Sequence, residues 1–135
     1  MTTETFAIYY VDFSSPEVDI AINSDPDYIY KNNDTAWFGL GLIFWINQDF
    51  DESIVFVKKA LKLDNKNSEY WLTLGKINND YNQKENAIKA LKQAARIDSE
   101  NTEIWITWVD VFLKNDEPKN AIRILKRGIK AKVHG

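Results

Sequence analysis

The sequence has no cysteine, one histidine and one methionine in 135 residues. The absence of cysteine excludes a disulfide scaffold and thiol chemistry, and it fits a reducing compartment. The histidine, His134, stands next to the C-terminus, where an ordered catalytic site is not expected. The acidic clusters at 25–27 and 49–52 lack the glycine and the closing glutamate of a calcium loop, and the sequence has no glycine-rich phosphate loop. We therefore expect no enzyme activity, no metal and no cofactor.

Long apolar runs are also missing. The longest one, 36–46, is 11 residues, about half of the roughly 20 that a membrane-spanning helix needs. No basic start followed by an apolar run indicates a secretory signal. The formal net charge is only −3, so the composition gives no general reason to expect binding to nucleic acid or to a membrane. We expect a cytoplasmic protein whose partners are proteins or peptides.

What the sequence does contain is a repeat. Trp37, Trp71 and Trp105 are evenly spaced along the chain. The same interval relates Leu40-Gly41, Leu74-Gly75 and Trp108-Val109, then Ile54, Ile88 and Ile122, then Ala60, Ala94 and Gly128. A fixed period of roughly 20 to 50 residues is typical of a solenoid, in which each repeat buries its apolar face against the next. The interval between successive tryptophans is 34 residues, which falls within this range.

Each repeat has the apolar spacing of helices. Trp71, Leu74, Gly75 and Asn78 follow one another at i, i+3, i+4 and i+7, and the same spacing returns after residue 84. This pattern predicts two helices joined by a turn in every repeat. Ser68 and Thr102 stand where they could cap the first helix of a repeat. The recurring small residues are expected to let the helices approach closely.

These residues resemble the tetratricopeptide repeat family over residues 34–135. The first repeat matches the family pattern at Trp37, Leu40, Gly41, Phe44, Val57, Ala60 and Asp64, and the second matches it at Trp71, Leu74, Gly75, Ala87, Leu91, Ala94 and Asp98. The resemblance implies an all-α superhelix, a right-handed solenoid of antiparallel helix pairs at 34–67, 68–101 and 102–135. The sequence departs from the pattern at Ser53, Asn65, Asn78, Ser99 and Val109, which loosens local packing.

Residues 1–33 have two possible interpretations. Phe6-Ala7 and Tyr10 precede Leu40-Gly41 and Phe44 by one such period, as in a degenerate repeat. The residues 5–13 are alternatively an extended arm, because they are rich in β-branched and aromatic side chains. In both cases we expect this segment to cover the first repeat, whose helix at 36–46 is apolar all round.

The resemblance implies that partners bind the concave surface formed by the first helix of each pair. The residues expected there are Phe38, Leu42, Trp45, Glu69, Leu72, Lys76, Asn79, Glu103, Ile106, Asp110 and Leu113. A clamp for acidic chaperone tails is not expected, because its positions hold one cation and one acid, Lys76 and Glu103. The surface suits a helix or an extended peptide with apolar anchors. Alternatively, the N-terminal arm covers Phe38, Leu42 and Trp45.

The last helix is expected to offer a second docking surface, drawn from Ile122, Leu125, Ile129 and Val133, with some of these side chains turned inward against Trp105 and Trp108. The chain has six basic residues and no acid from residue 118 onward, and seven acids against one lysine up to residue 35. The basic residues are either a solvated helix face or part of a docking surface. This helix is also a candidate surface for self-association. RNA binding is not expected, because no stacking aromatics are interleaved with the basic residues. We predict a scaffold for protein association, or alternatively a regulatory or targeting segment of a larger enzyme or secretion-system protein.

Overall fold

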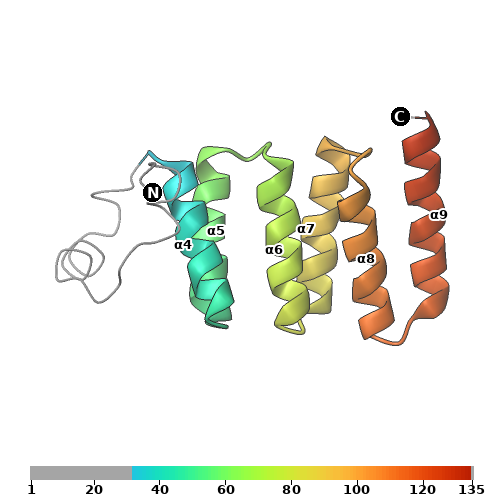
Figure 1. The fold of residues 1–135 in the computed structure, drawn as a ribbon, viewed down its shortest axis with the longest axis horizontal. Coiled ribbons are helices and arrows are strands. Elements are labelled where there is room, and N and C mark those ends of the chain that lie inside the picture. Colours follow the sequence, from blue (N-terminus) through green and yellow to red (C-terminus); the bar gives the residue numbers. More distant parts are fainter. Residues whose placement is uncertain (1–31, 135) are drawn as a thin grey trace, which may run out of the picture. The chain divides into compact units, whose positions relative to one another are not determined.

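The computed structural model describes residues 32–134, and this part of the chain consists of six α-helices without a strand (Figure 1). They are α4 (Asp34–Ile46), α5 (Phe50–Leu63), α6 (Ser68–Asp80), α7 (Lys84–Ile97), α8 (Thr102–Lys114) and α9 (Pro118–His134). Consecutive helices pack as the pairs α4–α5, α6–α7 and α8–α9, and α8 also packs against α6 and α7. The prediction of an all-α repeat fold is therefore confirmed. The interpretation of residues 1–33 concerns a segment that lies almost entirely outside the described residues.

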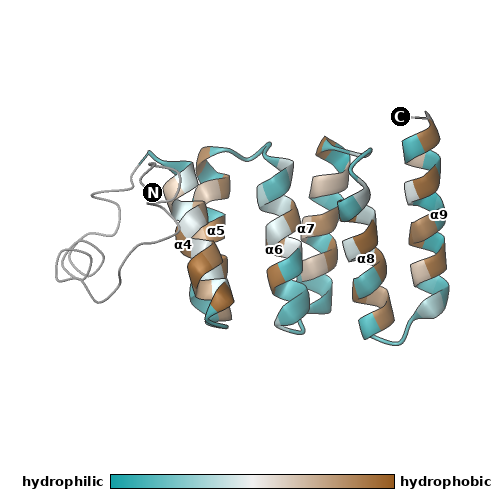
Figure 2. Ribbon diagram, in the orientation of Figure 1, coloured by the Kyte–Doolittle hydropathy of each residue, from teal (hydrophilic) through white to brown (hydrophobic). Residues whose placement is uncertain are grey.

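The chain divides into two compact units, Met1–Asn65 and Lys66–Gly135. The described part of the first unit is the pair α4–α5, and the second unit contains α6 to α9. Figure 2 shows hydrophobic residues along most of α4, whereas hydrophobic and hydrophilic residues alternate along α9. The apolar character predicted for the helix at 36–46 is thus a property of α4, and α9 is amphipathic.

Asparagine caps the first helix of every pair. The side chain of Asn33 accepts a hydrogen bond from the backbone nitrogen of Ala36, and Asn67 and Asn101 accept equivalent bonds at the starts of α6 and α8. The prediction that Ser68 and Thr102 are the caps was wrong, because these two residues already belong to the helices. Asparagine one position earlier has an extended backbone, and its side-chain oxygen reaches the free N–H groups of the first turn.

The turn inside each pair is the same left-handed helix end. Gln48, Asn82 and Asp116 have φ angles of 63°, 61° and 59° and occupy the same position in successive repeats. After α4, the N–H of Asp49 donates to the carbonyl of Phe44, and the N–H of Gln48 donates to that of Trp45. This is the Schellman arrangement, in which a left-handed residue closes the helix, and it is formed here without glycine.

Close contact between paired helices depends on three glycines. A Cβ atom at Gly41 would lie 2.5 Å from Val57 Cγ2, and one at Gly75 would lie 2.8 Å from Leu91 Cγ. At Gly128 the obstacle is Trp105, whose Cγ and Cβ would lie at 2.7 and 2.8 Å. The expectation that small residues permit close packing is therefore confirmed at these positions.

The three repeated tryptophans differ in their surroundings. Trp37 stacks on Phe56 at 5.7 Å between ring centroids, whereas Trp105 stacks on Trp108 at 5.5 Å. Both are buried, but Trp71 is only partly buried against the core of the second unit. The position of Trp108 is occupied by the smaller Leu74 in the second repeat. Two of the three repeated tryptophans are therefore buried, and their surroundings are not equivalent.

Candidate functional site

Four of the predicted concave-face residues lie together between α6 and α8. Lys76 forms an ion pair with Glu103, and Asn79 Nδ2 donates a hydrogen bond of 2.8 Å to Asp110 Oδ2. The Lys114 side chain donates to the backbone carbonyl of Asn79. These polar groups satisfy one another, so a ligand on this face has to bridge them or compete with them.

The other predicted residues of this face fall into two groups. Ile106 and Leu113 of α8 are exposed, as is Glu69 at the start of α6. Leu72 is only 4% exposed and belongs to the core of the second unit. Its aliphatic side chain is more stable among Leu91 and Ile104 than in water, so it is not an open contact residue in this structure.

Three further predicted residues belong to α4 in the first unit. Phe38 is buried, whereas Leu42 and Trp45 are partly buried. The segment predicted to cover them lies outside the described residues. Their role in binding therefore stays a prediction.

All four residues of the docking surface predicted on α9 are exposed. Ile122, Leu125, Ile129 and Val133, which we call the α9 stripe, are between 40% and 70% exposed. The expectation that some of them turn inward was wrong. Ala121, Ile124 and Gly128 fill the inward positions instead, because helical geometry places them on the neighbouring side of α9.

Leu125, Ile129 and Val133 of the α9 stripe line a shallow cavity of about 250 Å³ beside the start of α8. Its walls are made by Glu100, Thr102, Trp105, Ile106, Leu125, Gly128, Ile129, Lys132 and Val133. Most of this surface is aliphatic or aromatic. The cavity therefore suits an apolar side chain with a charged or polar residue near its rim.

The positions of the α9 stripe have counterparts one repeat earlier on α7. Ile88, Leu91 and Ala95 occupy in the second repeat the positions of Ile122, Leu125 and Ile129 in the third, and all three pack in the core that contains Trp105 and Trp108 of α8. On α7 this surface thus packs against the next helix, α8. In α9 the same positions hold large apolar residues that remain between 40% and 58% exposed.

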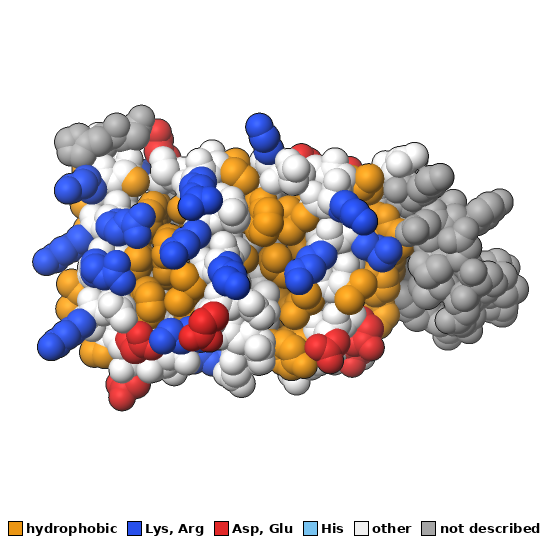
Figure 3. All heavy atoms as spheres, turned by 180° about the vertical axis from the view of Figure 1, so that it is seen from behind, with side chains coloured by type: hydrophobic (Ala, Val, Ile, Leu, Met, Phe, Trp, Pro, Cys, Tyr) orange, Lys and Arg blue, Asp and Glu red, His pale blue; other side chains and the backbone are white. Residues whose placement is uncertain are grey.

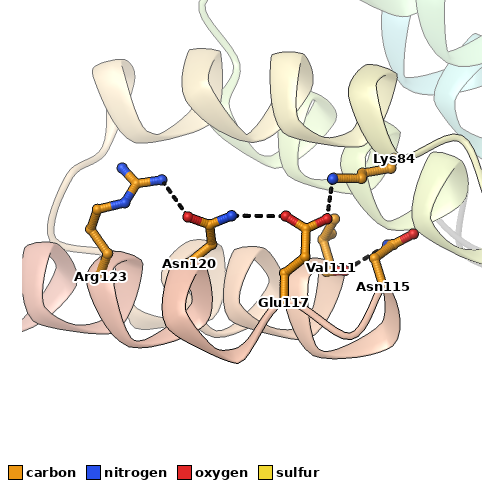
Figure 4. Close-up of polar contacts among 6 residues, drawn as sticks. All are labelled: Lys84, Val111, Asn115, Glu117, Asn120 and Arg123. Carbon is orange, nitrogen blue, oxygen red and sulfur yellow. Dashed lines mark hydrogen bonds and ion pairs between the residues drawn. The ribbon is translucent and has the colours of Figure 1, made fainter.

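A polar network joins the start of α7 to the turn between α8 and α9 (Figure 4). Glu117 forms an ion pair with Lys84, and its Oε1 accepts a hydrogen bond of 2.8 Å from Asn120. Asn120 Oδ1 in turn accepts from Arg123 at 3.2 Å. The hydrogen bond from Lys84, together with that from Asn120, holds the pKa of Glu117 below its usual value. We assign this network a structural role, because it connects consecutive repeats.

The repeated caps, turns and glycine contacts agree with a comparison of the sequence with known families. The family description "Tetratricopeptide repeat" matches residues 34–67 and 68–101, which correspond to α4–α5 and α6–α7. The chain belongs to the tetratricopeptide repeat family. The pair α8–α9 continues the tetratricopeptide repeat (TPR) pattern with the same cap and the same turn. No curated protein matches the sequence.

Solved structures show the same TPR fold. A crystal structure of MamA has a TM-score of 0.74 at 13% identity and covers 97% of this chain and 80% of its own. A second MamA crystal structure has a TM-score of 0.75 at 13% identity, with 96% and 73% covered. At this identity the likeness shows the fold alone.

Within residues 32–134 no helix is long and apolar enough to cross a membrane. The same part of the chain has no group of three or more histidine, aspartate or glutamate side chains arranged to hold a metal ion.

One surface was missed by sequence analysis. Trp108 and Arg127 are in contact and line a groove between α7 and α9. From the sequence, Arg127 could equally be an ordinary basic residue on a solvated helix face. The signal present in the sequence was the replacement of Leu74 and Gln93 of the second repeat by Trp108 and Arg127 in the third. An aromatic residue and a cation at these two positions can form a cation–π contact where the fold brings them together.

Proposed function

We propose that this protein is a non-catalytic TPR scaffold that binds an amphipathic helix of a partner protein through the α9 stripe. The observation that supports this proposal most directly is the exposure of Ile122, Leu125, Ile129 and Val133. Large apolar side chains gathered on one face of a helix are characteristic of docking surfaces. The cytoplasmic location stays a prediction.

A helix is the occupant that this surface suits best. In the second unit, α8 packs against the surface of α7 that corresponds to the α9 stripe. A partner helix on α9 would repeat that packing with larger anchors, because Ile129 replaces Ala95. Each such side chain contributes about 1.5–3 kcal/mol when it is fully buried, before the costs of association are subtracted.

We propose the polar face of α6 and α8 as a second contact region for the same partner. Ile106 and Leu113 would supply apolar anchors there, with Lys76–Glu103 and Asn79–Asp110 as the polar groups between them. This arrangement provides hydrogen-bonding groups for register and apolar contacts for affinity.

The test compares capture of partner proteins from native lysate by the wild type and two variants. Ile129→Glu places a charge in the α9 stripe, and Val55→Glu makes the same change at a similarly exposed apolar position on α5. We expect Val55→Glu to retain the partners and Ile129→Glu to lose them, with both variants as helical as the wild type. Light scattering of the purified chain determines whether a second copy is the occupant.

The proposal is contradicted if the captured partner proteins are lost from other variants than Ile129→Glu. If Ile129→Glu captures the same proteins as the wild type while Leu113→Glu does not, the docking surface is the face of α6 and α8. If neither substitution changes the captured set, both surfaces are excluded as the site of specific binding.

A further inference from the structure

A second groove lies between α7 and α9, over the two tryptophans of α8. Its volume is about 740 Å³. It is lined by Lys92, Ala95, Arg96 and Ser99, by Trp105 and Trp108, and by Arg127, Lys130 and Ala131. We call it the basic groove. Figure 3 shows this face, on which Lys and Arg side chains surround hydrophobic surface.

We propose that the basic groove binds an extended acidic peptide segment of a partner protein. The site is separate from the α9 stripe, because helical rotation of about 100° per residue places Arg127 and Lys130 on another side of α9 from Leu125 and Ile129. Binding here therefore does not require the helix docking proposed above.

The charges of the groove all have one sign. Lys92 and Arg96 come from α7, Arg127 and Lys130 come from α9, and no carboxylate is among the lining residues. Guanidinium and ammonium groups on two facing walls attract a chain that carries carboxylates at intervals. The strength of this attraction falls as salt is added, because the cations are exposed at the rim.

One of the tryptophans that line the groove carries a buried N–H donor without an acceptor in the described part of the chain. Trp108 is 2% exposed, and its Nε1 has no hydrogen-bond partner within residues 32–134. The neighbouring Trp105 differs, because its Nε1 donates to the carbonyl of Ser99 at 2.8 Å. Buried N–H groups are almost always paired. Because this nitrogen is shielded from solvent, a carboxylate or carbonyl oxygen of a bound peptide would complete its bonding only after the side chains around Trp108 move apart.

The aromatic rings favour a peptide over a nucleic acid. Trp105 and Trp108 stack on each other with an angle of 8° between their planes, and the Arg127 guanidinium lies 5.7 and 5.6 Å from their centroids. The rings are thus engaged with each other and with Arg127, and both residues are buried. Binding to bases depends on open aromatic faces. Small apolar residues such as Ala95 and Ala131 leave room instead for an aliphatic side chain between carboxylates.

Arg127 is held in place before any ligand arrives. Its cation–π contacts with two indoles reduce the number of conformations it must lose on binding. The second repeat has Gln93 and Leu74 at the positions of Arg127 and Trp108. This combination of a fixed cation and an indole donor therefore belongs to the third repeat.

The experiment measures binding of a fluorescein-labelled twelve-residue peptide of alternating aspartate and leucine to the full chain by fluorescence anisotropy at low salt. Arg127→Gln and Lys130→Gln remove cations of the groove, and Lys119→Gln removes one from the exposed start of α9 outside it. We expect Kd to rise about tenfold for each groove variant, as for loss of a hydrogen bond to a charged group, and to stay unchanged for Lys119→Gln. Lys130→Gln keeps the test valid if Arg127→Gln disturbs the stacked tryptophans.

Two control ligands and one control variant decide the interpretation. The same peptide with asparagine in place of aspartate should not bind, and Ile129→Gln, which makes the α9 stripe polar without adding charge, should bind the acidic peptide as the wild type does, which separates this site from the α9 stripe. Equal losses for Lys119→Gln and the groove variants would overturn the proposal, because they would indicate non-specific attraction. Tighter binding of a twelve-nucleotide uridine RNA, with the same dependence on Arg127, would overturn it in favour of a nucleic-acid site.

Discussion

The contact between Gly128 and Trp105 leads to a prediction that opposes the pattern of the repeat. The first two repeats have Ala60 and Ala94 at the position of Gly128, so the pattern favours alanine. Gly128→Ala also improves helix propensity by about 1 kcal/mol in the interior of α9. Both arguments predict a more stable protein, and the structure predicts the reverse.

The reason is the identity of the atoms that a new methyl group would meet. The added Cβ would lie 2.7 Å from Trp105 Cγ and 2.8 Å from Trp105 Cβ. These atoms are at the root of the side chain and cannot turn away without moving α8. The indole is also held by stacking on Trp108. Overpacking of this kind costs about 1–3 kcal/mol, which exceeds the gain in propensity by up to about 2 kcal/mol.

The assay is urea unfolding followed by far-UV circular dichroism, with near-UV circular dichroism to report on the stacked indoles. The difference between Lys126→Gly and Lys126→Ala, at an exposed position of the same helix, measures the propensity term directly. Gly128→Ala should be less stable than the wild type and should change the near-UV signal. An increase in stability equal to that propensity term would refute the reasoning.

Two further predictions concern the ends of helices. Because Lys84 and Asn120 lower the pKa of Glu117, their stabilising effect is present above the usual glutamate pKa of about 4.3 and is lost as the pH falls through the lowered value. Thermal melts should therefore show Glu117→Gln to be less stable than the wild type at neutral pH, with the difference disappearing in acid; a constant difference would contradict this linkage. Gln48→Gly should raise the stability of α4–α5 by about 0.5–1 kcal/mol in urea unfolding, because relief of the left-handed backbone outweighs the entropy of glycine. The equivalent Asn82→Gly should gain less, since asparagine tolerates this conformation, and equal gains would indicate another cause.

The helix pairs could be predicted from sequence because the period and the 3.6-residue spacing are local properties. The predicted caps lie one residue too late, because Asn67 and Ser68 are both good capping residues. Only the backbone angles distinguish the two. The burial of Leu72 depends on how close α8 comes to α6, which no spacing within one helix reveals. The exposure of all four residues of the α9 stripe was underestimated, because Ala121 and Gly128 are too small to be recognised from sequence as the inward face.

The basic groove could not be predicted because its walls belong to two helices that are distant in sequence. Lys92 and Arg96 look like ordinary exposed residues of α7, and Arg127 and Lys130 look like those of α9. Only the folded structure shows that these four residues line one groove together with Trp105 and Trp108 of α8. The hydrogen-bonding state of the Trp108 indole is likewise a property of the packed state.

The polar links between the second and third repeats have a consequence for the order of folding. Lys76–Glu103, Asn79–Asp110, Lys84–Glu117 and Lys114–Asn79 join residues 27, 31, 33 and 35 positions apart. Each link can close as soon as the following helix pair has been synthesised, because none depends on a distant part of the chain. Short sequence separations of this kind reduce the entropy lost in forming contacts and accelerate folding. The α6–α9 unit should therefore assemble progressively on the ribosome, with α6–α7 serving as the template on which α8 and α9 condense.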